Sequence, residues 1–242
     1  AVVTCNKVAA SSSLDSYKEL KRLSRTYNAP FLFETNVGAG LPIINTLHNL
    51  IASVDRVHAI KAVLSGSLNF IFNHFDEKTP FEEVVRRAQK EGYTEPDPRI
   101  DLSGVDVLRK ILILARESGY ALEADDIENK SFLPEGALAA KSVEDFYEVL
   151  RNQADYFQRM LKKAAEKGCK LKYVATFDDG KAKVGLEEIP QGHPFYDIAG
   201  KDNIVLFYTN RYREQPLIVK GAGAGAEVTA SGIFGDIIRV RK

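Results

Sequence analysis

The two residues that most clearly indicate catalysis are Asp106 and Lys110, which lie four positions apart in an apolar stretch of the chain. On a helix this spacing places both side chains on one face. One interpretation is an exposed ion pair, which contributes roughly a few tenths of a kcal/mol. The surrounding residues favour burial instead, because the stretch is apolar on nearly every side: Val105, Val107, Leu108, Ile111, Leu112, Ile113, Leu114 and Ala115. A buried lysine is costly unless it is paired or used, and beside a carboxylate it can donate a proton to a carbonyl oxygen.

Three carboxylates stand in a proline-stiffened segment just before this helix. Glu95 is placed by the rigid loop and could face a cationic substrate amine. Asp97 could instead form a turn with Arg99, and Asp101 or Ser103 could cap the following helix. The spacing matches no calcium-binding loop.

Two glycine-containing segments could approach a ligand with their backbone. Residues 221–225 follow a predicted strand and precede a predicted helix, but their GxGxG spacing fails as a complete dinucleotide fingerprint. Residues 37–41 could turn carbonyl groups toward a monovalent cation, with Glu34 supplying charge. A plain turn between strand and helix explains residues 37–41 equally well.

Composition excludes several classes of function. The 242 residues carry 33 basic and 33 acidic side chains, and this balance argues against a nucleic-acid-binding protein. No apolar run is long enough to cross a bilayer. Two cysteines outside any CxxC motif fit a reducing cytoplasm, and Cys5, inside an apolar run at residues 1–5, is expected to be an inert buried thiol. These features favour a cytoplasmic protein that acts on a small molecule.

The pattern of helices and strands that must position these residues predicts an α+β fold. A strand, a helix and a second strand within residues 1–33 form one parallel βαβ step. One long helix is expected from about 101 to 119, and two more between about 142 and 168. Alternating residues from 171 to 219 predict antiparallel strands, with Asp179-Gly180 as a type I′ hairpin turn. The expected architecture is a mixed or antiparallel sheet covered by helices, flanked by remnants of a nucleotide-binding domain.

Six segments, in order along the chain, resemble homoserine dehydrogenases, and most closely the dehydrogenase half of bifunctional aspartokinase–homoserine dehydrogenases. These segments are residues 4–7, 34–42, 64–69, 92–98, 101–110 and 221–230. The resemblance implies NAD- or NADP-dependent interconversion of L-homoserine and L-aspartate 4-semialdehyde in threonine and methionine biosynthesis. It also implies a homodimer or higher homo-oligomer, with no nucleic-acid or membrane partner.

The same resemblance implies roles for individual residues. Lys110 would donate the proton to the carbonyl oxygen, and Lys7 would lie beside both cofactor and substrate as a further catalytic and cofactor-binding residue. The expected substrate-binding residues are Glu95, Asp106, Asp101 and Ser67. Gly92 and Gly225 would contact the cofactor. A sodium ion would be held by Glu34 and the backbone of Val37, Ala39 and Leu41.

The first strand, the GxGxxG turn and the following acid of the family's cofactor domain do not occur in this sequence. Residues 1–37 are therefore expected to be a C-terminal remnant of the nucleotide-binding domain. Residues 38–220 would form the substrate-binding, catalytic and dimerisation domain, and residues 221–242 a helix returning to the nucleotide-binding domain. Such a truncated piece is expected to bind NAD(P) poorly and to be inactive by itself.

Two alternatives remain open from the residues alone. The chain could be a non-catalytic assembly module whose strands between 171 and 219 form a dimer interface. It could also be an enzyme in which Cys5 is an acylating nucleophile, although no histidine stands near it in sequence.

Overall fold

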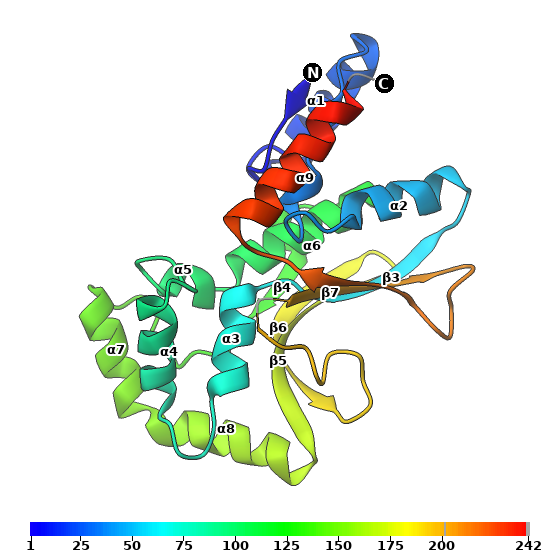
Figure 1. Ribbon diagram of the computed structural model, residues 1–242. Coiled ribbons are helices and arrows are strands. Elements are labelled where there is room, and N and C mark those ends of the chain that lie inside the picture. Colours follow the sequence, from blue (N-terminus) through cyan, green and yellow to red (C-terminus); the bar gives the residue numbers. More distant parts are fainter. Residues whose placement is uncertain (201, 241–242) are drawn as a thin grey trace.

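A computed structural model describes residues 1–200 and 202–240 of the chain. A mixed β-sheet with helices against it forms the larger part, and a smaller part that contains both termini projects from it (Figure 1). This arrangement confirms the predicted α+β class.

The smaller part contains the predicted βαβ step. Strand β1 (Val2–Val3) pairs in parallel with β2 (Phe31–Leu32), and α1 (Leu14–Thr26) connects them. Helix α1 begins after Ser13, whose hydroxyl accepts a hydrogen bond from the backbone N–H of Ser16 at 3.3 Å. Although residues 1–5 are apolar, β1 is not buried, because Val2 is 55% exposed. Cys5 is exposed as well, so it is not a core thiol.

The larger sheet, within the described residues, has six strands in the order β4-β6-β5-β3-β7-β8. Neighbouring strands are antiparallel except β4 and β6, which are parallel. The strands are β3 (Val57–Val63), β4 (Ile127–Lys130), β5 (Cys169–Asp178), β6 (Lys181–Pro190), β7 (Asp202–Thr209) and β8 (Leu217–Ala222). Asp179 and Gly180, with φ of 38° and 91°, connect β5 to β6 and confirm the predicted hairpin turn.

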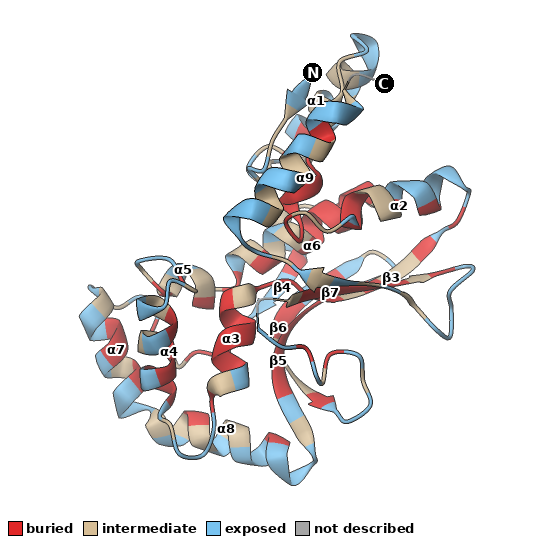
Figure 2. Ribbon diagram, viewed as in Figure 1, coloured by how far each residue is buried: buried red, intermediate tan, exposed pale blue. Residues whose placement is uncertain are grey.

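Helices lie against one face of this sheet and form the main core. Alternate residues of the central strands, including Ile60, Phe177 and Phe207, are fully buried in this core (Figure 2). The opposite face carries a smaller cluster in which Val63 and Val174 meet Phe195 from the segment after β6. Further helices are α2 (Ile43–Ala52), α3 (Gly66–His74), α4 (Phe81–Lys90), α7 (Val143–Asn152), α8 (Ala154–Glu166), α9 (Ala226–Arg239) and the short 3-10 helices η1 (Glu34–Asn36) and η2 (Ala124–Asp126).

The helix predicted from about 101 to 119 is two helices in the structure. Helix α5 (Arg99–Leu102) ends before Gly104, and α6 (Val105–Glu117) begins after it. Gly104 has a φ of 74°, a left-handed conformation that interrupts a right-handed helix. An added Cβ at this position would lie 1.9 Å from the hydroxyl oxygen of Tyr173, so any larger residue would have to displace this tyrosine side chain. The break sets the direction in which α6 leaves α5.

Helix α6 is buried as its composition predicts, with Val107 and Ile111 to Glu117 all buried. Strand β4 was not predicted, because its sequence lacks the alternation of the other strands and three of its four residues are exposed. No helix in the described residues is long and apolar enough to span a membrane.

Candidate functional site

The first turns of α6 hold a lysine whose ammonium group is fixed from two sides. The Nζ atom of Lys110 lies 2.7 Å from Oδ2 of Asp106 and donates a hydrogen bond of 2.7 Å to the carbonyl oxygen of Leu64, just past the end of β3. Only 13% of the Lys110 side chain is exposed. An ammonium group has three protons, so this arrangement leaves one for a further acceptor.

A second lysine approaches the same carboxylate from the smaller part of the molecule. Lys7, which follows β1, has its Nζ atom 3.3 Å from Oδ1 of Asp106. Burial of Asp106 opposes its ionisation, but the charges of Lys110 and Lys7 outweigh burial and hold its pKa below the usual range. Asp106 is therefore a carboxylate that bridges two ammonium groups.

Asp101 brings a second carboxylate to the site from α5. Its Oδ1 atom accepts a hydrogen bond of 2.8 Å from the hydroxyl of Ser67, and its Oδ2 atom accepts one of 2.9 Å from the backbone N–H of Glu95. The hydroxyls of Ser65 and Ser67 lie 3.0 Å apart at the start of α3. Burial raises the pKa of Asp101 above its usual range, and the charges of Glu95 and Asp106 add to this effect.

These groups line one cavity of about 280 Å³ between α3, α5, α6 and the segment before α9. The cavity combines one ammonium group, two carboxylates, two serine hydroxyls and one tyrosine hydroxyl with the backbone of three glycines. Its lining residues are Ser65, Gly66, Ser67, Gly92, Tyr93, Asp101, Asp106, Val107, Lys110, Ala224 and Gly225.

Gly92 and Gly225 are open positions in the cavity wall. Their φ angles are 73° and 131°, and an added Cβ at either would meet no other heavy atom within 4 Å. The backbone at both places is therefore accessible to a ligand in the cavity. Gly223 differs, because an added Cβ there would lie 1.7 Å from Oδ1 of the buried Asn203.

Glu95 is exposed and does not line the cavity; its backbone N–H is the group that hydrogen-bonds to Asp101. Its carboxylate is nonetheless close enough for its charge to raise the pKa of Asp101. Asp97 forms an ion pair with Arg99, with 2.5 Å between oxygen and nitrogen, which confirms the turn considered from sequence. Asp101 does not cap α6; the hydroxyl of Ser103 instead accepts a hydrogen bond of 3.3 Å from the backbone N–H of Val105, its first residue.

Glu34 has a structural role that the sequence alone did not show. Its carboxylate accepts hydrogen bonds from the backbone N–H groups of Ile44 at 2.7 Å and Asn45 at 2.9 Å, at the start of α2. Burial raises its pKa above the usual range. The carbonyl of Leu41 likewise accepts the N–H of Ile43 at 2.8 Å. These hydrogen bonds use oxygen atoms of Glu34 and Leu41, and a sodium ion held by Glu34, Val37, Ala39 and Leu41 remains a prediction.

Sequence reasoning did not assign the carbonyl of Leu64, Ser65 or Tyr93 to the site. Ser65 stands in the matched segment 64–69 beside Ser67, so its type and position could have indicated it. The contact at Leu64 uses a backbone carbonyl, which every residue has, so the residue type does not indicate it. The contact between Lys7 and Asp106 joins residues far apart in the chain. Neither contact can be found from local patterns.

A model of the homoserine dehydrogenase family matches residues 42–238. The chain is 46% identical to a maize bifunctional aspartokinase/homoserine dehydrogenase 1, described as chloroplastic, over 99% of this chain and 26% of the relative. It is 44% identical to the bifunctional aspartokinase/homoserine dehydrogenase of Haemophilus influenzae, over 98% of this chain and 29% of the relative. The chain thus spans between a quarter and a third of these curated relatives.

Among solved structures, a Candida auris protein described as of unknown function aligns with a TM-score of 0.93 and 37% identity, covering 99% of this chain and 69% of that one. A hyperthermophilic archaeal homoserine dehydrogenase in complex with NADPH aligns with a TM-score of 0.75 and 28% identity, covering 99% of this chain and 63% of that one.

The plant relatives are chloroplastic, so the cytoplasmic location remains a prediction. With its sequence matched by the family model along most of its length, the chain belongs to the homoserine dehydrogenase family.

Proposed function

We propose that this chain supplies the substrate-binding and catalytic part of an NAD(P)-dependent enzyme that interconverts L-homoserine and L-aspartate 4-semialdehyde in threonine and methionine biosynthesis. The observation that carries the proposal is the ammonium group of Lys110, held by Asp106 and the Leu64 carbonyl at the wall of a polar cavity. The archaeal structure with NADPH supports a nicotinamide cofactor for the family.

Lys110 acts as the proton donor in the reducing direction. Its third proton is free for the carbonyl oxygen of the semialdehyde, and donation of that proton turns the developing alkoxide into the hydroxyl of homoserine. In the oxidising direction the proton moves the other way, from the hydroxyl of homoserine to the amine of Lys110. Asp106 holds the amine in place and stabilises its charged form. Lys7 forms an ion pair with the same carboxylate and lies on the side of the site where the cofactor would bind.

The acidic side of the cavity binds the substrate ammonium group. Asp101 is half-buried and held by Ser67 and the Glu95 backbone, so its direction into the cavity is fixed. Glu95 adds negative charge at the rim. Asp106 contributes a further carboxylate, so an amino aldehyde fits this cavity better than a neutral aldehyde would.

The open backbone positions fit a nicotinamide cofactor. Gly92 and Gly225, with Lys7 nearby, would hold its nicotinamide end beside the substrate. The cofactor, when bound, supplies or accepts the hydride. The inactivity of this chain in isolation remains a prediction, and the test below therefore uses the complete polypeptide.

The test compares Lys110→Met with Lys163→Met, which removes an exposed lysine from α8. Reduction of aspartate semialdehyde is followed through the absorbance of the reduced nicotinamide. We expect Lys110→Met to lower kcat by about 100-fold or more, in line with the loss of a general acid, and Lys163→Met to leave it unchanged. Wild-type turnover by Lys110→Met would refute the proposal, and collapse in Cys5→Ala instead would favour the exposed thiol as nucleophile.

We further propose a homodimer or higher homo-oligomer built on the sheet face opposite the helices. Tyr196 and Tyr208 are only partly buried where they pack against the smaller cluster on that face, and Ile218 of β8 is 44% exposed. Light scattering on the complete protein tests this, and Ile218→Lys is expected to weaken association. A monomer at high concentration would refute it.

A further inference from the structure

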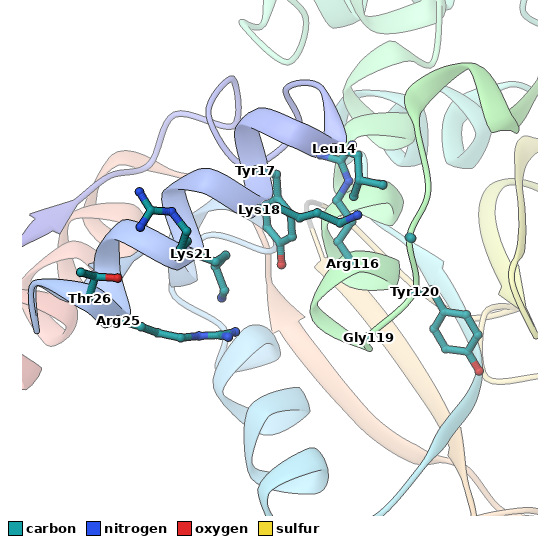
Figure 3. A pocket seen from close by; sticks show the side chains of 11 residues that line it. Leu14, Tyr17, Lys18, Lys21, Arg25, Thr26, Arg116, Gly119 and Tyr120 are labelled. Carbon is teal, nitrogen blue, oxygen red and sulfur yellow. The ribbon is translucent and has the colours of Figure 1, made fainter.

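A second cavity, of about 550 Å³, lies between α1 and the end of α6 and shares no lining residue with the candidate active site. Its volume falls within the range of about 300–1,000 Å³ that is common for small-molecule sites. Five cationic side chains and no acidic one line it. Its lining residues are Leu14, Tyr17, Lys18, Lys21, Arg22, Arg25, Thr26, Arg116, Gly119, Tyr120 and Ala121 (Figure 3).

Four of the cations come from one helix. Lys18, Lys21, Arg22 and Arg25 are spaced at three and four residues along α1, so they share one face of it. Arg116 of α6 is the fifth, and its guanidinium group is fully buried. Figure 3 shows Lys18, Lys21 and Arg25 extending from α1 on the side of Arg116 and Tyr120. The positive charge is therefore gathered at a concave surface, although the whole chain is neutral.

Three of these cations already have an acidic partner. Lys21 lies 2.9 Å from Glu117, Arg22 lies 2.7 Å from Glu19, and Arg116 lies 3.0 Å from Glu123. Lys21 and Arg22 keep protons free for a ligand beside these pairs. Arg116 also donates to the backbone carbonyls of Ala10, Ser12 and Leu122, so it adds positive charge to the pocket rather than a free donor.

Lys18 and Arg25 differ from the other three, because neither forms an ion pair with any residue in the part of the chain that the structure describes. Like charges gathered in a concave site without neutralisation attract an anion, since low-dielectric walls concentrate the field there. Ammonium and guanidinium groups together suit phosphate or carboxylate oxygens.

We propose that this α1–α6 pocket binds a small, multiply charged anion carrying phosphate or carboxylate groups, with Lys18 and Arg25 as its main contacts. Because the pocket and the candidate active site share no residue, this proposal does not depend on the proposed catalytic function.

The test is calorimetric titration of the complete protein with pyrophosphate and, in a separate arm, with citrate, at constant ionic strength set by potassium chloride. We expect one saturable site with a Kd below about 1 mM for at least one of the two anions. Tighter binding of pyrophosphate assigns the site to phosphate-bearing ligands, and tighter binding of citrate assigns it to polycarboxylates. The absence of saturable binding by both anions would refute the proposal.

The double variant Lys18→Met/Arg25→Gln tests the location. The matched control is Arg159→Gln/Lys162→Met, which removes two cations from a pocket beside α8 that also contains Glu77 and Asp155. We expect the first variant to weaken anion binding by about tenfold or more and the control to change it less than about twofold. Equal weakening of anion binding by both variants would show a general attraction to positive charge and would refute the proposed site. If the double variant does not fold, the single variants Lys18→Met and Arg25→Gln give the same comparison.

Discussion

Gly104 links the two helices that carry the candidate site, and its substitution by alanine should be strongly destabilising. A left-handed φ costs an alanine roughly 1–2 kcal/mol. The added Cβ would also lie 1.9 Å from the hydroxyl oxygen and 2.8 Å from Cζ of Tyr173, which is buried and donates a hydrogen bond to Asn129. Crowding of this kind costs about 1–3 kcal/mol more. The sum predicts a loss of about 2–5 kcal/mol in the free energy of unfolding.

Gly119→Ala is the matched control for this effect. Gly119 also has a positive φ, of 93°, but an added Cβ there would meet no other atom within 4 Å. Urea unfolding should therefore show only the backbone cost, roughly 1–2 kcal/mol, for the control. Adding Tyr173→Phe to Gly104→Ala removes the closest atom, and the double variant should be more stable than the sum of the two single effects predicts. The reasoning is refuted if Gly104→Ala costs no more than Gly119→Ala.

Three further predictions concern groups around the same helices. Hydrogen bonds and charges from His48, Lys21 and Tyr17 outweigh burial and lower the pKa of Glu117 from 4.5 to about 2, so its stabilising effect is complete above pH 4.5 and is lost as pH falls toward 2. That shift corresponds to about 3 kcal/mol, and acid unfolding of Glu117→Gln should lack this part of the pH dependence; an unchanged profile would contradict the assignment. Gly223→Ala should lower thermal stability far more than Gly235→Ala on α9, where an added Cβ has open space; equal melting temperatures would contradict the close approach of Asn203. Asp101→Asn should raise KM for homoserine by about tenfold while the exposed control Asp125→Asn does not; an unchanged KM would remove Asp101 from substrate binding.

Local patterns in the sequence predicted most elements correctly because they depend on local chemistry. The hairpin turn at Asp179-Gly180 and the βαβ step within residues 1–33 depend on patterns within a short stretch of the chain. The pairing of Asp106 with Lys110 likewise follows from helical spacing and apolar surroundings.

The errors and omissions depend on contacts between distant segments. The hydroxyl of Tyr173 on β5 occupies the space that a side chain at residue 104 would take, which the sequence around the helix cannot show. Cys5 was expected to be buried because its neighbours are apolar, but β1 pairs with β2 at the exposed end of the molecule. The hydrogen bonds from the carboxylate of Glu34 to the start of α2 are a further contact that local patterns do not indicate, while its role in a cation site stays a prediction.

The central claim is that Lys110, fixed by Asp106, transfers the proton of the reaction. The most direct test is a crystal structure of the complete protein with L-homoserine and the oxidised nicotinamide cofactor bound. The account predicts the homoserine hydroxyl oxygen within about 3 Å of Lys110 Nζ, with the ammonium group of the substrate toward Asp101. A substrate hydroxyl that contacts another titratable group, with Lys110 directed away from it, would contradict the account.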